Sequence, residues 1–261
     1  MTASERLDLV HRTGPDSGHE HARRRPDVPR GAVTAADGVL VVDKPQGLTS
    51  HDVVGATRRL AATRKVGHAG TLDPLATGIV VLATGRATKK IEMLQNTTKE
   101  YVATLKLGAT TPSFDMEHPE DASFPTEHID IDLIQKALEQ FRGDILQIPP
   151  VYSAVKVNGK RAFDYARKGD QVELKAKPLV IDEIEVIKFD MPWLTLRVVC
   201  SKGTYIRALA RDIGKSLDSG AYLTALRRTR VGDVCVADCI TIEEFEQTLE
   251  EKATKSADSS N

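Results

Sequence analysis

The chain of 261 residues contains only three cysteines, Cys200, Cys235 and Cys239. A small odd number of cysteines does not form a disulfide framework, and it is typical of a protein kept in a reducing compartment. Cys235 and Cys239 are too few to hold a metal ion by themselves, and none of the seven histidines lies close to them in the sequence. We therefore expect neither disulfides nor a metal site.

Long apolar runs are also missing. The longest, such as residues 39–42 and 79–83, are far shorter than the roughly 20 residues that cross a bilayer. The first thirty residues carry charges where a secretion signal needs an apolar segment. The sequence has neither a dinucleotide-binding fingerprint nor a phosphate-binding P-loop. We therefore expect a cytoplasmic protein with no membrane segment and no cofactor.

The chain has almost no net charge, with a formal value of −1, which by itself argues against a nucleic-acid ligand. The basic side chains are nevertheless gathered in places, and such clusters can neutralise phosphate groups while the total charge stays near zero. The alternative for each cluster is an ordinary solvated face. The clusters are Arg58, Arg59, Arg64 and Lys65; Lys156, Lys160, Arg161, Arg167, Lys168, Lys175 and Lys177; and Arg227, Arg228 and Arg230.

Apolar periodicity predicts one domain over residues 37–252, between disordered tails at 1–36 and 253–261. The predicted strands outnumber βαβ units, so we expect an α+β fold with a mixed, mostly antiparallel β-sheet and flanking helices. Ser50 is the predicted N-cap of the first helix. Strands are predicted at 38–42, 79–82, 101–107, 179–189, 193–200 and 222–230, with 179–189 and 193–200 as an antiparallel pair. Helices are predicted at 51–63, 87–94, 130–141, 161–168, 204–217 and 242–252.

The segment from Gly67 to Gly78 is the most distinctive stretch of the chain. Its three glycines and one proline exclude a continuous helix or a central strand and predict a shaped loop. Asp73 stands before Pro74, which favours an extended backbone, and the apolar run from Ile79 gives the loop a buried anchor. Asp73 is therefore a candidate for chemistry. The alternative is that the Asp-Pro pair merely begins a turn.

Four segments, followed by Leu226-Arg227-Arg228, carry a family resemblance. In order along residues 38–245, they resemble the TruB family of pseudouridine synthases, which modify the T-loop uridine at position 55 of tRNA. The resemblance implies a pseudouridine synthase fold, an isomerase activity and the tRNA T-arm stem-loop as partner. Because no exposed heptad or long apolar edge is evident in the sequence, we also expect a monomer with no obligate protein partner. Only about twenty residues follow Ile240, so we expect none of the C-terminal PUA-like domain that many members carry. The segments are 42–50, 67–78, 149–156 and 201–207.

The resemblance also implies roles for particular residues. Asp73 matches the catalytic aspartate of the family, and Arg207 matches the arginine that pairs with it. Tyr101 matches the aromatic residue that stacks on the target base. The remaining matches are Tyr205 and Leu226, which line the uracil pocket; His68, which lies against the displaced nucleotides; and residues 152–177, the flap that closes over the RNA. Ala69 stands where a threonine is common in the family, and Phe163 where a tyrosine is common.

The chemistry explains why these residue types are suitable. The reaction breaks the N1–C1′ bond and forms a C5–C1′ bond without gain or loss of atoms, so one carboxylate can serve as nucleophile or proton acceptor. A guanidinium such as that of Arg207 favours the ionised carboxylate. The base must leave its stack, and an aromatic platform such as Tyr101 restores about 1–3 kcal/mol of stacking. Lys44, Pro45 and Tyr152 are expected to shape the site.

Three rival hypotheses stay open from the sequence. A non-catalytic tRNA-binding or tRNA-folding protein of the same fold shares every feature except the need for Asp73. A hydrolase would use Asp73 on a nucleoside or glycoside, but glycosidases ordinarily use two carboxylates, and no second acid is close to Asp73 in the sequence. An RNA-guided synthase of the same superfamily ordinarily needs protein partners. The sequence also leaves open whether Asp73 attacks C6 or C1′, or removes a proton from C2′.

Overall fold

The computed structural model describes residues 38–258, so the tail predicted at 1–36 lies outside the described residues. The described chain forms two compact units. We name them from their place in the sequence. The central unit is residues 98–226, and the terminal unit combines residues 38–97 with residues 227–258. The second unit is therefore built from two stretches that the first one separates along the chain.

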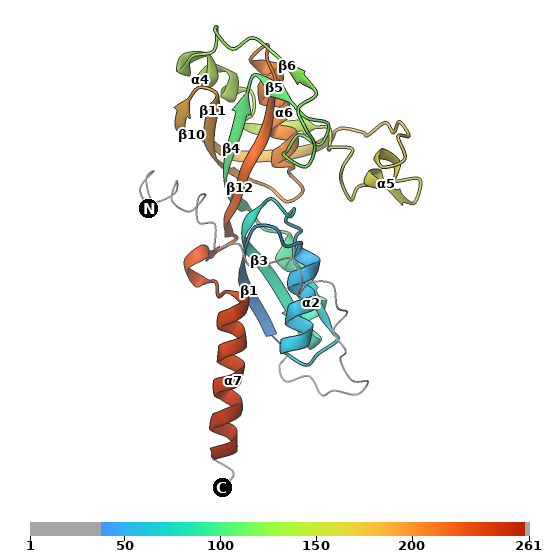
Figure 1. Ribbon diagram of the computed structural model, residues 1–261, viewed down its shortest axis with the longest axis vertical. Coiled ribbons are helices and arrows are strands. Elements are labelled where there is room, and N and C mark those ends of the chain that lie inside the picture. Colours follow the sequence, from blue (N-terminus) through green and yellow to red (C-terminus); the bar gives the residue numbers. More distant parts are fainter. Residues whose placement is uncertain (1–37, 259–261) are drawn as a thin grey trace. The chain divides into compact units, whose positions relative to one another are not determined.

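The central unit is organised on an antiparallel set of strands (Figure 1). Strands β4 and β11 pair with Trp193 opposite Lys106, and β11 pairs with β10 across the predicted turn at 190–192. This confirms the predicted antiparallel pair. In order across the unit, the strands are β12 (Ala221–Val231), β4 (Lys99–Leu107), β11 (Trp193–Cys200), β10 (Lys177–Asp190) and β7 (Gly143–Gln147), with a separate pair β5 (Ala109–Thr110) and β6 (Ala122–Ser123).

Helices α4 (Ile131–Glu139) and α6 (Ile206–Ser216) complete the core of the central unit. Asp130 caps α4 by accepting a hydrogen bond from the Leu133 amide. The apolar face of this helix is buried. Leu209 and Ile213 of α6 are buried, as are Leu194 and Leu196 of β11. These apolar side chains of α6 and β11 form part of the core of the central unit.

The segment with the basic cluster at 156–177 stands apart from the other elements of the central unit (Figure 1). A tight hairpin joins β8 (Lys156–Val157) to β9 (Lys160–Arg161), with Asn158 and Gly159 both at positive φ as such a turn requires. Helix α5 (Ala162–Ala166) follows, and its first amide donates to the Val155 carbonyl at 2.7 Å. All seven basic side chains of the cluster at 156–177 are exposed.

In the terminal unit, β3 (Thr77–Thr84) is the central strand and is buried along its whole length. β1 (Gly38–Lys44) and β2 (Val66–His68) are antiparallel to β3, and Arg227 and Arg228 of β12 pair with it in parallel. Ile79 and Val81 pack with Ala69 and Val231. The other elements are α2 (Ser50–Leu60), η1 (Gly85–Lys90), α3 (Ile91–Gln95), β13 (Val234–Cys235), η2 (Val236–Asp238) and α7 (Ile242–Asp258).

The predicted mixed, mostly antiparallel α+β fold is confirmed, and several local details differ from the prediction. The helix predicted at 87–94 is a 3-10 helix, η1, followed by the short α3, and strands β2, β5, β6, β7, β8, β9 and β13 were not predicted. Thr49, rather than Ser50, caps α2, and it forms a capping box with Asp52. Helix α7 continues to Asp258 instead of ending near Lys252. Within residues 38–258, no helix has the length and apolar character needed to cross a membrane.

Candidate active site

The six candidate residues are divided between the two units. His68 and Asp73 belong to the terminal unit, whereas Tyr101, Tyr205, Arg207 and Leu226 belong to the central unit. Leu226 and Arg227 are consecutive in β12, so one strand supplies residues to both units.

The loop that carries Asp73 is held by backbone hydrogen bonds on both sides of the carboxylate. Before it, the Leu72 amide donates to Ser50 Oγ at 2.8 Å, and this hydroxyl donates to the Leu72 carbonyl at 3.1 Å. After it, the Pro74 carbonyl accepts from the Gly47 amide at 2.8 Å. The Asp73 carbonyl accepts from the Ala76 amide at 3.0 Å. The side chain of Asp73 is half-buried, so a fixed loop backbone carries a partly shielded carboxylate.

The buried side chain of Arg228 holds the same loop through hydrogen bonds to backbone carbonyls. Its side chain is 1% exposed, Nε donates to the Ile79 carbonyl at 2.7 Å, and Nη2 donates to the Gly70 carbonyl at 3.2 Å. Arg227 is buried as well and holds both oxygens of Asp43 at 3.0 and 2.6 Å. The hypothesis of a phosphate-binding surface at 227–230 is therefore wrong for Arg227 and Arg228, whose guanidinium groups serve groups of the chain itself.

Lys44 brings a buried positive charge to the Asp73 side of the terminal unit. Its side chain is 0% exposed, and Nζ donates to the carbonyls of Pro45 at 2.9 Å and Leu48 at 2.7 Å. Burial lowers the pKa of Lys44 from 10.5 to about 8; the negative charge of Asp73 opposes this shift, and the charge of Arg228 adds to it. The sequence analysis expected Lys44 to shape the site, and the structure adds an electrostatic link to Asp73.

The lowered pKa of Lys44 predicts a pH-dependent stability. Below about pH 8 the lysine is protonated both folded and unfolded, so the cost of burying its charge is fully present. Between pH 8 and 10.5 the folded protein has lost a proton that the unfolded chain keeps, so the free energy of unfolding rises with pH. We expect a rise of about 2–3 kcal/mol between pH 7.5 and 10 in wild type relative to Lys44→Met.

Urea unfolding of the full chain at both pH values measures this difference. Lys65→Met, which removes an exposed lysine of the same unit, is the control and should track wild type. Parallel curves for wild type and Lys44→Met would contradict the prediction.

His68 is the last residue of β2 and is half-buried. Burial is the main reason that the pKa of His68 is lowered; a hydrogen bond with the Gly70 backbone opposes this shift, and the neighbouring charges of Arg228 and His51 add to it. Its Nδ1 is buried without a hydrogen-bond partner within the described part of the chain. A ring that stays uncharged near neutral pH is suited to packing against bases rather than to binding phosphates.

Arg207 lies in the first turn of α6 and is 6% exposed. Nη2 donates to the Tyr152 carbonyl at 2.9 Å, and Nη1 donates to the Ser113 carbonyl at 3.2 Å. Nη1 also lies 3.5 Å from Asp115 Oδ2, which makes a buried ion pair. The pairing of Arg207 with Asp73 stays a prediction.

Asp115 was not among the predicted site residues, because it lies between the strand predicted at 101–107 and the helix predicted at 130–141, where no element was predicted. It is buried, and its Oδ1 accepts hydrogen bonds from Ser113 Oγ at 2.6 Å and the Glu117 amide at 2.9 Å. The signal in the sequence was an aspartate two residues after a serine, the spacing at which such side chains organise turns.

The other three candidates of the central unit have fixed backbones. Tyr205 precedes α6, and the buried Gln147 side chain holds both its amide at 2.9 Å and its carbonyl at 3.2 Å. Tyr101 is a buried residue of β4 opposite Val198, and Leu226 is a buried residue of β12. Tyr205 is half-buried. The backbone at each of these three residues is therefore held in place, by a strand at Tyr101 and Leu226 and by Gln147 at Tyr205.

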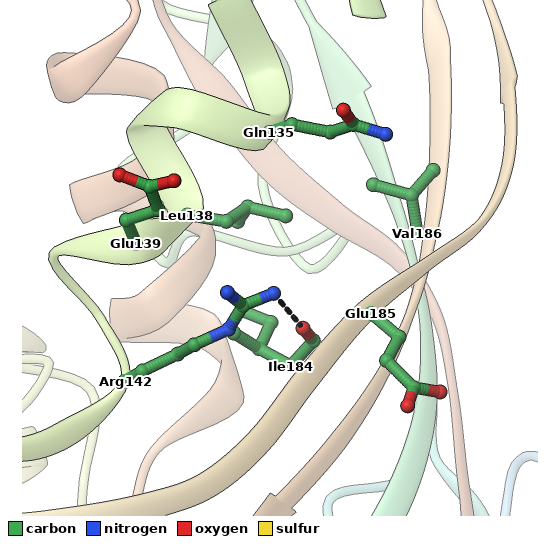
Figure 2. A pocket seen from close by; sticks show the side chains of 7 residues that line it. All are labelled: Gln135, Leu138, Glu139, Arg142, Ile184, Glu185 and Val186. Carbon is green, nitrogen blue, oxygen red and sulfur yellow. Dashed lines mark hydrogen bonds between the residues drawn. The ribbon is translucent and has the colours of Figure 1, made fainter. Parts of the chain in front are cut away.

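A pocket of about 310 Å³ lies elsewhere in the central unit, between α4 and β10. Figure 2 shows Arg142 reaching across it to the Ile184 carbonyl, at 3.3 Å. None of the six candidates lines this pocket. Across residues 38–258, no three or more His, Cys, Asp or Glu side chains are grouped so as to hold a metal ion. The lining residues are Gln135, Leu138, Glu139, Arg142, Ile184, Glu185 and Val186.

Comparison with known families finds two matches that together run from residue 58 to residue 259. Residues 58–206 match the N-terminal domain of TruB family pseudouridylate synthases. Residues 207–259 match the C-terminal domain of tRNA pseudouridylate synthase B.

Two curated relatives are similar to this chain over nearly their whole length. The tRNA pseudouridine synthase B of Phocaeicola vulgatus is 60% identical over 220 residues, covering 82% of this chain and 94% of the relative. The enzyme of the same name from Flavobacterium johnsoniae is 47% identical over 219 residues, covering 81% and 96%.

Two solved structures are similar over more than half of their chains. One is a crystal structure of a Cbf5-Nop10-Gar1 complex, at a TM-score of 0.63 and 30% identity, covering 90% of this chain and 60% of that chain. The other is an H/ACA RNP bound to a substrate RNA containing 2′-deoxyuridine, at a TM-score of 0.60 and 28% identity, covering 80% and 52%. The chain thus spans between half and three fifths of the length of these solved chains.

Proposed function

Because the chain belongs to the TruB family of pseudouridylate synthases, we propose that it isomerises uridine to pseudouridine at position 55, in the T-loop of tRNA. The family match includes the loop with Asp73, together with Tyr101 and Tyr205. Since tRNA is the proposed substrate, we further propose a cytoplasmic monomer that needs no protein partner and no cofactor.

The observation that carries this proposal is the way the Asp73 loop is held. Its anchors are backbone groups and the Ser50 hydroxyl on both sides of the aspartate, so the backbone that carries the carboxylate is fixed in place. The buried cations of Lys44 and Arg228 belong to the same unit, and the charge of Lys44 interacts with that of Asp73. A carboxylate on a backbone fixed in this way can be presented to a substrate in one position.

The proposed reaction needs few protein groups. The target nucleotide leaves the stacked loop, and Asp73 acts as nucleophile or as proton acceptor. The N1–C1′ bond breaks, the uracil turns, and C5 bonds to C1′. C5 then loses its proton to water while N1 gains one, so atoms and electrons balance without an outside reactant.

The central unit contributes the groups around the base in this proposal. Tyr101 stacks on the flipped uracil, and Tyr205 and Leu226 line its pocket. Arg207 pairs with Asp73. Asp115 supports this role, because its ion pair and the Ser113 and Tyr152 carbonyls fix the guanidinium in place.

Recognition of the RNA is proposed for two further features. The exposed basic side chains of the 156–177 cluster neutralise phosphates of the T-arm stem as the flap at 152–177 closes. His68 fills the gap that the flipped nucleotide leaves in the loop, a task that fits its lowered pKa and uncharged ring.

Tritium release tests the proposed function. A tRNA transcript labelled with tritium at C5 of its uridines is incubated with the wild-type chain, and a transcript with cytidine at position 55 serves as control. We expect one label per tRNA to enter the solvent from the first transcript and none from the second.

Binding of both transcripts without release of label would contradict the proposal and favour the non-catalytic tRNA-folding alternative. Release from the control transcript would mean that another uridine is the target.

A further inference from the structure

Helix α6 presents two arginines to the same side. Arg207 and Arg211 are four residues apart, so their side chains lie one above the other on the helix. Arg207 reaches the Ser113 and Tyr152 carbonyls, and Arg211 Nη2 donates to the Ile148 carbonyl at 2.9 Å. The two guanidinium groups therefore hold the same two segments, residues 111–115 and 147–152.

Phe114 is the second partner of Arg211. The Arg211 guanidinium carbon lies 5.0 Å from the centre of the Phe114 ring, a distance at which a cation and an aromatic face attract each other. Asp212 also binds this guanidinium, through Nε at 2.8 Å and Nη2 at 3.0 Å, and so fixes its plane over the ring.

The backbone of Phe114 has an unusual conformation, with φ at +62°. A bulky residue rarely adopts this left-handed geometry, and the surrounding structure must hold it there. The Phe114 amide donates to the Thr111 carbonyl at 3.1 Å, and its carbonyl accepts from the Leu223 amide at 3.0 Å. The turn places the Ser113 carbonyl on one side of Phe114 and Asp115 on the other, and both contact Arg207.

We propose that Phe114 and Arg211 are positioning residues for Arg207. The Phe114 ring, held by the Arg211 guanidinium, fixes the turn at 113–115, and this turn fixes the Arg207 guanidinium through Ser113 and Asp115. The inference rests on the proposed function, in which Arg207 pairs with the reacting carboxylate. Neither Phe114 nor Arg211 contacts the substrate in this arrangement, so their loss changes the rate of reaction and leaves tRNA binding intact.

Four variants of the full chain distinguish the effect of losing the Phe114 ring from the effect of disturbing the fold. Phe114→Asn keeps a residue that tolerates positive φ but removes the ring, whereas Phe114→Tyr keeps the ring. Arg211→Lys keeps the charge but loses the planar group that stacks. Lys215→Gln, an exposed change one turn further along α6, is the control.

The measurements are the single-turnover rate of tritium release with enzyme in excess over labelled tRNA, the Kd for that tRNA by filter binding, and the melting temperature. We expect Phe114→Asn and Arg211→Lys to lower the rate about ten-fold. Their Kd is expected to stay within about two-fold of wild type. Phe114→Tyr and Lys215→Gln should match wild type in both.

A wild-type rate in Phe114→Asn, or a loss that appears in Kd rather than in the rate, overturns the inference and leaves the proposed function standing. If Phe114→Asn does not fold, Arg211→Lys decides by the same criterion. Failure of the wild-type chain to release tritium overturns the proposed function itself, and this is seen before any variant is compared.

Discussion

Replacement of Asp73 by asparagine is expected to reduce tritium release from tRNA at least about a thousand-fold. The amide has nearly the shape of the carboxylate but is neither a nucleophile nor a proton acceptor. The loop should keep its conformation, because its anchors are backbone groups and the Ser50 hydroxyl. The Kd for tRNA should therefore stay close to that of wild type.

The measurement pairs tritium release with filter binding of the same transcript. Asp233→Asn makes the identical chemical change at an exposed position of the terminal unit and is the matched control. Retention of a tenth or more of wild-type activity by Asp73→Asn would exclude the carboxylate from the chemistry. Loss of tRNA binding would instead point to a structural task for Asp73.

Replacement of Gly78 by alanine is expected to destabilise the protein by at least about 4 kcal/mol. Gly78 has φ at +101°, and a Cβ at this position would lie 2.2 Å from the Arg228 carbonyl oxygen. It would also lie 2.9 Å from the backbone nitrogen and carbonyl carbon of Arg228. These are backbone atoms of a paired strand, so neither side yields without breaking the contact between β3 and β12.

Gly70→Ala provides the comparison for this prediction. Gly70 has a similar φ of +105°, but its nearest neighbour for a Cβ is Arg228 Nη1 at 3.5 Å, an ordinary contact. We expect about 1–2 kcal/mol for Gly70→Ala, the cost of backbone strain alone. Equal losses in urea unfolding for the two variants would show that strain, rather than close approach, explains the requirement for glycine at position 78.

The antiparallel pairing could be predicted from the sequence because two β-type segments, 179–189 and 193–200, are joined by a turn at 190–192 that contains Pro192. The structure pairs them as expected, although the register of β10 is irregular at two places that the sequence did not indicate. The cap of α2 could not be assigned in this way, because Thr49 and Ser50 are both good N-cap residues. The grouping into two units depends on pairing between Thr77 and Arg227, which no local pattern indicates.

The residues of the candidate site also fall into two groups: those that a local sequence pattern indicates, and those whose role depends on residues distant in the chain. Glycine and proline reveal the Asp73 loop because they limit the backbone locally. Buried charged residues cannot be recognised in this way, because a charged side chain is expected to lie in solvent unless its partner is known. The ion pairs of Arg227 with Asp43 and of Arg207 with Asp115 join residues distant in the sequence, so they form only when the chain folds. The sequence analysis therefore assigned Arg227 and Arg228 to a surface and missed Asp115.

The division of the terminal unit into two stretches has a consequence for the order of folding. The central unit is contiguous and is complete once Leu226 has been synthesised. Strand β3 is made much earlier, but Arg227 and Arg228, which pair with Thr77 and Gly78, come off the ribosome only after the whole central unit. Until then the Gly70 and Ile79 carbonyls lack the guanidinium that later holds them. We therefore expect the Asp73 loop to be among the last parts of the nascent protein to acquire its native structure, because it depends on contacts between residues distant in the chain.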